Sequence, residues 1–123
     1  MKILVVDDDD LVRDAVGEML AAVGHPVLKL RDGQQALQAL RRRAPDLVIT
    51  DIRMPGLTGV DLCIAARNLY PDLPVIGMSG HATDDGREDL FAGFLQKPFQ
   101  MADLIDKVDE VRRNRVWKAE TKS

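Results

Sequence analysis

The sequence predicts an α/β domain in which helices wrap a parallel β-sheet. Short apolar runs alternate along the chain with longer segments of helical periodicity, which is the pattern of strands joined by crossover helices. The 123 residues fit one domain, and 46% hydrophobic with 30% charged residues is an ordinary balance for a globular protein. Right-handed crossovers are therefore expected between the parallel strands.

Five short runs are the strand candidates. Val and Ile dominate the runs at 2–6, 46–50 and 74–78, as is typical of strands covered on both faces. The run at 26–30, PVLKL, alternates apolar and polar residues and is closer to an edge strand. The fifth candidate is GFLQK at 93–97.

The first three helix candidates follow the first three strands. Residues 11–23 carry apolar side chains at three- and four-residue steps, with Asp10 as a plausible N-cap and Gly24 as the stop. The second helix is expected at 34–43. The third is expected at 59–69, with an apolar face made by Val60, Ile64 and Leu69.

The last two helix candidates differ in strength. Residues 84–92, DDGREDLFA, offer few apolar positions, so a short or irregular fourth helix is expected there. A long amphipathic helix is expected from Met101 to Trp117, and the polar residues 118–123 are expected to form a disordered tail.

Composition excludes several classes of protein. The single cysteine, Cys63, cannot form a disulfide within the chain and suits a reducing cytoplasm. A net charge of −3 gives no basic surface for direct binding of nucleic acid or an anionic membrane. Because no apolar run approaches the ~18–20 residues that span a bilayer, and the N-terminus lacks a secretory signal, a cytoplasmic location is expected.

Polar side chains stand at the carboxyl ends of four predicted strands, where parallel sheets bind ligands. Asp7 and Asp8 follow the first strand, Asp51 the third, Ser79 the fourth, and Lys97 ends the fifth. Carboxylate oxygens are preferred ligands of Mg²⁺, which would relieve the repulsion among the acids and screen the attack of a carboxylate on phosphorus. The lysine and the hydroxyl could then contact phosphoryl oxygens.

The acidic run at 7–10 also has a simpler reading, because acidic runs after strands are usually solvated loops. For Asp9 and Asp10 that reading is preferred, with one of them capping the following helix. A calcium-binding EF-hand is excluded, since Leu11 and Val12 stand where that loop needs an oxygen ligand and a glycine.

Four motifs carry a family resemblance: ILVVDDDD, LVITDIRMPGLTGVDL, PVIGMSGHA and FLQKPF. With them the chain resembles the receiver domain of bacterial two-component response regulators over about residues 2–116. The resemblance implies a receiver domain at 1–117 with a doubly wound, flavodoxin-like sheet of five parallel strands in the order 2-1-3-4-5. It also implies phosphorylation of an aspartate by a histidine kinase or a phosphotransfer protein.

Site roles follow from the resemblance by position. Asp51 is the phosphoacceptor. Asp8 is a direct ligand of Mg²⁺, which Mn²⁺ can replace, and Asp7 binds the ion through water. Asp51 and the backbone carbonyl of Arg53 are further ligands.

The remaining roles concern the phosphoryl group and its consequences. Ser79 and Lys97 hold the phosphoryl group, and the peptide bond between Lys97 and Pro98 is cis. Phe94 is the switch aromatic that turns inward when the Ser79 hydroxyl moves toward the phosphate. Arg53 and His81 flank the phosphoryl group and are expected to slow its hydrolysis.

Other functions fit the sequence less well. An aspartate-nucleophile phosphatase with Mg²⁺ is the enzymatic alternative, but such enzymes place a second Asp where this chain has Arg53. A flavodoxin-like cofactor binder would need a phosphate-binding loop after the first strand, where four acids would repel phosphate. The chain is therefore expected to catalyse only its own phosphorylation and hydrolysis, and not to be an enzyme on an external substrate.

The resemblance also bears on partners. A monomer or weak dimer with an unidentified output protein or domain is expected. The chain is either a single-domain regulator or a receiver from a larger protein, and FLQKPF resembles receivers fused to hybrid histidine kinases.

Overall fold

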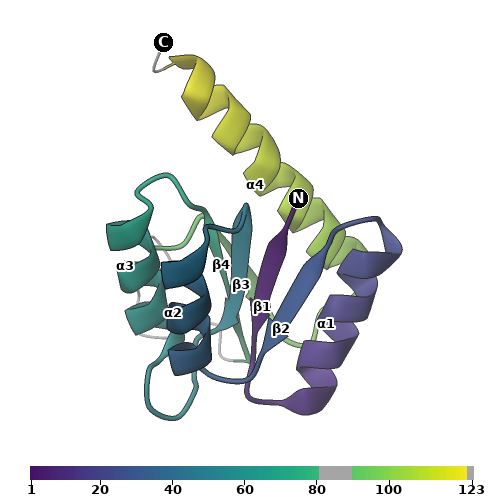
Figure 1. Ribbon diagram of the computed structural model, residues 1–123. Helices are drawn as coiled ribbons and strands as arrows, with labels where there is room; N and C mark the ends of the chain where they lie inside the picture. Colours follow the sequence, from purple (N-terminus) through teal and green to yellow (C-terminus); the bar gives the residue numbers. More distant parts are fainter. Residues whose placement is uncertain (81–89, 122–123) are drawn as a thin grey trace.

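The structure is a computed structural model, and it describes residues 1–80 and 90–121 (Figure 1). From residue 3 to residue 79 strands and helices alternate, as the sequence predicts. The elements are β1 (Ile3–Val6), α1 (Asp10–Ala22), β2 (Val27–Leu30), α2 (Gly33–Arg42), β3 (Leu47–Asp51), α3 (Gly59–Leu69), β4 (Val75–Ser79), β5 (Gly93–Gln96) and α4 (Met101–Thr121).

The five strands form one parallel sheet in the order β2-β1-β3-β4-β5, which confirms the predicted fold class. β2 is an edge strand, as its alternating sequence predicts. β1 and β3 are neighbours at the centre, and Val6 pairs in register with Thr50. The carboxyl ends of β1 and β3 therefore lie side by side.

Helices cover both faces of the sheet, with α2 and α3 on one side and α1 and α4 on the other (Figure 1). Successive side chains of a strand point to opposite faces. In β1, Leu4 and Val6 pack with α2 and α3, whereas Ile3 and Val5 pack with α1 and α4. Two covered faces explain why β1 is apolar at every position.

The start of α1 differs from the prediction by one residue. Asp9 is the N-cap, and its carboxylate accepts hydrogen bonds from the backbone N–H groups of Leu11 at 2.9 Å and Val12 at 3.3 Å. Asp10 is already helical, because only the residue before it has the extended backbone of a cap. Leu11, which the periodicity assigns to the apolar face, is 83% exposed.

The buried face of α3 matches the predicted one only at Val60, which packs against the core cluster. Ile64 is 44% exposed and Leu69 is 42% exposed, while Leu62, Cys63 and Ala66 are buried. Gly59 packs directly on the backbone at the end of β3, and this contact fixes the rotation of the helix. The residues three, four and seven positions after Gly59 therefore face the sheet.

Two predictions for the later part of the chain stay predictions. α4 continues to Thr121, beyond the predicted helix end at Trp117. The disordered tail expected at 118–123 stays a prediction. Most of the expected fourth helix, residues 84–89, lies outside the described residues. No helix in the described part of the chain has the length and apolar character that spanning a membrane requires.

Candidate functional site

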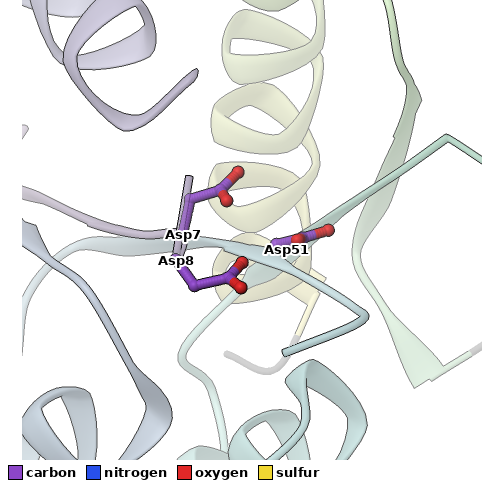
Figure 2. Close-up of side chains that lie close together, drawn as sticks. All are labelled: Asp7, Asp8 and Asp51. Atoms are coloured by element: carbon purple, nitrogen blue, oxygen red, sulfur yellow. The ribbon is translucent and has the colours of Figure 1, made fainter. Parts of the chain in front are cut away.

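Three carboxylates meet where β1 and β3 end. Figure 2 shows Asp7, Asp8 and Asp51 grouped at this edge of the sheet, and one carboxylate oxygen from each lies within 4.8 Å of the others. Asp7 is fully buried and Asp51 nearly so, whereas Asp8 is exposed. The site is thus a pair of buried acids with one acid at its solvent side.

The backbone around Asp51 is held from both sides. The next amide, of Ile52, donates to the carbonyl of Met78 in β4 at 3.0 Å. On the other side α3 begins against the same turn: the amide of Gly59 donates to the carbonyl of Ile52 at 2.9 Å. A Cβ added to Gly59 would lie 2.2 Å from the carbonyl oxygen of Asp51. Only glycine allows this approach, so Gly59 helps to fix the position of Asp51.

Lys97 lies between the two buried acids. Its ammonium is 2.9 Å from a carboxylate oxygen of Asp7 and 3.5 Å from one of Asp51. The sequence predicts Lys97 at this edge of the sheet but not its short contact with Asp7. Asp7 is the more deeply buried acid, and an unpaired carboxylate there would be costly.

Burial and repulsion change the proton affinity of Asp51. Burial raises its pKa to about 6, and the nearby carboxylate of Asp7 adds to the rise, while Lys97 opposes it. For Lys97, burial alone would lower the pKa, but the hydrogen bond and charges of Asp7 and Asp51 raise it. The site therefore favours additional positive charge.

The ends of β4 and β5 complete this edge. Ser79 is buried at the end of β4, and its carbonyl accepts a hydrogen bond from the amide of Lys97 at 2.7 Å. The bond between Lys97 and Pro98 is cis, as the resemblance implies. Ser79 is the last residue of β4, and Lys97 is the first residue after β5. Both strands lie on the same side of β3, so the two residues lie on the same side of Asp51.

Of the other predicted site residues, Arg53 and Phe94 lie in the described part of the chain. Arg53 is exposed, two residues after Asp51. Phe94 is partly buried in β5 and packs against the core cluster under α2 and α3. His81 lies outside the described residues.

Sequence reasoning missed two residues that support the site. Gly59 is one, and Arg13 is the other, because its guanidinium donates to the backbone carbonyl of Asp7 at 3.0 Å. For Gly59 the sequence holds only a weak signal, which is a small residue at the start of a helix that follows a strand. No local pattern predicts the second, since the contact depends on how the loop folds back.

Comparisons with known proteins agree with this geometry. The model of the response regulator receiver domain family matches residues 3–109. The response regulator protein FleR of Pseudomonas aeruginosa is 36% identical over 111 residues, which are 87% of this chain and 24% of FleR. The chain therefore spans about a quarter of the length of that curated relative.

Two solved structures are similar over most of the chain. NtrX from Brucella abortus has a TM-score of 0.91 at 33% identity, covering 98% of this chain and 29% of NtrX. The chemotaxis protein CheY4 of Vibrio cholerae has a TM-score of 0.82 at 28% identity, covering 89% of this chain and 97% of CheY4.

Proposed function

Since this chain belongs to the family of response regulator receiver domains, whose model matches residues 3–109, we propose that it accepts a phosphoryl group on Asp51. As a receiver domain it acts in two-component signalling. The donor is a histidine kinase or a phosphotransfer protein, and the phosphorylated chain acts on an output protein or domain. It acts in the cytoplasm, because a chain with a single cysteine suits a reducing compartment.

The observation that carries this proposal is the grouping of three carboxylates around Asp51 with their oxygens within 4.8 Å. Carboxylates at this spacing suit Mg²⁺ or Mn²⁺, which take oxygen ligands. Asp8 would bind the ion directly and Asp7 through water, while Asp51 and the carbonyl of Arg53 would complete the protein ligands. When bound, the ion supplies positive charge that screens the carboxylates from an incoming phosphoryl group.

The residues of the chain have separate parts in the transfer. An oxygen of ionised Asp51 attacks phosphorus, and the bond from phosphorus to the donor breaks as the donor leaves with its electron pair. Lys97, already within 3.5 Å of Asp51, neutralises the added charge, and the Ser79 hydroxyl donates to a phosphoryl oxygen. The attack needs the ionised carboxylate. In the protein without the ion, burial and Asp7 raise the pKa of Asp51 to about 6, and a bound cation would favour the ionised form.

We also propose that phosphorylation is signalled by a movement of Ser79 and Phe94. Ser79 and Phe94 lie on β4 and β5, which are paired neighbours in the sheet. A hydroxyl drawn toward the phosphoryl group would leave room that the partly buried aromatic ring can enter. The surface formed by β5 and α4 would change with it.

Phosphorylation should require the divalent ion and its ligands. With acetyl phosphate and Mg²⁺, intact-mass analysis is expected to find one added phosphoryl group, and excess chelator should prevent it. Asp8→Asn should slow the reaction at least about tenfold, because it removes a ligand. Asp106→Asn, an exposed acid on α4, is the control and should react as the wild type does. An adduct that forms equally fast with chelator would contradict the proposal.

Arg53 and His81 are proposed to obstruct water near the phosphoryl group. Arg53→Ala and His81→Ala should each shorten the lifetime of the phosphorylated protein, measured as loss of the adduct after the donor is removed. Unchanged lifetimes in both variants would exclude this role.

A further inference from the structure

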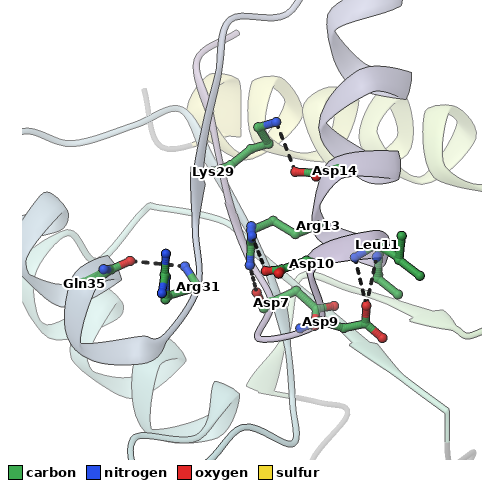
Figure 3. Close-up of polar contacts among 10 residues, drawn as sticks. Asp7, Asp9, Asp10, Leu11, Arg13, Asp14, Lys29, Arg31 and Gln35 are labelled. Carbon is green, nitrogen blue, oxygen red and sulfur yellow. Dashed lines mark hydrogen bonds and ion pairs between the residues drawn. The ribbon is translucent and has the colours of Figure 1, made fainter.

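Arg13 reaches from the first turn of α1 back to the loop that carries the acids. Figure 3 shows its guanidinium between Asp7 and Asp10: one nitrogen donates to the backbone carbonyl of Asp7 at 3.0 Å, and the other pairs with the carboxylate of Asp10. The side chain of Arg13 is 13% exposed, whereas that of Asp10 is 80% exposed. The guanidinium is therefore mostly covered and held by two partners.

The carbonyl that Arg13 contacts belongs to the peptide unit joining Asp7 to Asp8. β1 ends at Val6, so this carbonyl lies beyond the strand. The amide of Asp7 donates to the carbonyl of Leu30 at 3.1 Å, and its carboxylate accepts from the amide of Asp9 and from Lys97, each at 2.9 Å. With Arg13, each polar group of this buried residue has a partner.

A fixed peptide unit determines where the next residue leaves the loop. The unit is planar, so holding its oxygen also fixes the direction of the N–Cα bond of Asp8. Asp8 is exposed, and packing does little to hold its side chain. The Arg13 contact therefore restrains the backbone from which the Asp8 carboxylate reaches the other two acids.

We propose that Arg13 is a positioning residue of the cation site, which keeps the Asp8 carboxylate beside those of Asp7 and Asp51. This rests on the proposed function, because it concerns the binding of Mg²⁺ at these acids. Asp10 holds the guanidinium in place from the solvent side. Partners that orient metal ligands in this way commonly change metal affinity by about 10–100-fold when they are removed.

An ion pair between β2 and α1 offers a matched control. Lys29 lies 3.2 Å from Asp14 of α1, and both side chains are about half exposed, at 45% and 54%. Figure 3 shows this pair apart from the acidic loop. Lys29→Gln removes the same unit charge as Arg13→Gln, but it leaves the contacts of Asp7 intact. The pair of variants separates loss of charge from loss of position.

The test is the dissociation constant of Mg²⁺ by isothermal titration calorimetry, with urea unfolding in chelator to measure stability separately. Arg13→Gln is expected to weaken Mg²⁺ binding about tenfold. Arg13→Lys should weaken it as well, because an ammonium keeps the charge but loses the planar fork that reaches both partners. Lys29→Gln should bind as the wild type does.

The outcomes separate this inference from the proposed function. Wild-type affinity in folded Arg13→Gln would overturn it, even if stability falls, because a merely structural residue weakens the ion-free and ion-bound forms equally. Wild-type Mg²⁺ affinity in Arg13→Lys would overturn it too, because the positive charge of residue 13 would then be enough without the geometry of the guanidinium. If the wild-type protein itself binds no Mg²⁺, the proposed function fails, and the inference fails with it.

Discussion

Replacing Asp51 by asparagine is expected to abolish phosphorylation by acetyl phosphate while making the Mg²⁺-free protein more stable near neutral pH. The first effect follows because the amide has no carboxylate oxygen to attack phosphorus. The second follows because Asp51 is a buried acid repelled by Asp7, with its pKa raised to about 6. The gain should be about 1–3 kcal/mol in urea unfolding.

The pH dependence of this gain has a defined sign. The folded wild type binds the Asp51 proton more tightly than the unfolded chain, in which the pKa of this carboxyl is near its ordinary value of 3.8. The stability of the wild type should therefore fall as pH rises from about 4 through about 6. Asp51→Asn should not lose stability over this pH range by the same cause. The two proteins should therefore differ little in stability at acid pH and most near neutral pH.

Asp106→Asn is the control for both effects, since Asp106 is exposed on α4. It should be phosphorylated normally, and its stability should follow the wild type with pH. An Asp51→Asn protein that is less stable than the wild type at neutral pH without Mg²⁺ would contradict the assigned repulsion.

Replacing Gly59 by alanine is expected to lower the free energy of unfolding by about 3 kcal/mol or more, or to prevent folding. The added Cβ would lie 2.2 Å from the carbonyl oxygen of Asp51 and 2.7 Å from the Cα of Ile52. Both atoms belong to the backbone, which cannot rotate out of the way as a side chain can. The start of α3 or the end of β3 would have to move.

Gly80→Ala is the matched control, because no atom of the described residues lies within 4 Å of a Cβ added at Gly80. It should unfold at nearly the same urea concentration as the wild type. Helix propensity alone would make Gly59→Ala stabilising by up to about 1 kcal/mol. A Gly59→Ala protein as stable as the wild type would show that α3 does not pack as described.

The fold was predictable because hydrophobic pattern and layer position agree in most elements. β1 is apolar at four successive positions, and the sheet covers both of its faces. The alternating β2 stands at the edge. The pattern failed in α3, where Ile64 and Leu69 are exposed, because the contact of Gly59 with β3 sets the rotation of that helix.

The site was predictable only as far as backbone topology determines it. The ends of parallel strands meet at one edge, so the grouping of Asp7, Asp8 and Asp51 follows from the strand order. Long side chains are different, because their reach depends on the loop they cross. The contacts of Lys97 with Asp7 and of Arg13 with the Asp7 carbonyl therefore needed the structure.

The central claim is that the Asp51 carboxylate carries the phosphoryl group. The most direct measurement treats the wild-type protein with acetyl phosphate and Mg²⁺, reduces the acyl phosphate with borohydride, and sequences the peptides by tandem mass spectrometry. Reduction converts a phosphorylated aspartate to homoserine. We predict homoserine at position 51; homoserine at position 7 or 8 instead, or at no position in a protein shown to be folded, would contradict the claim.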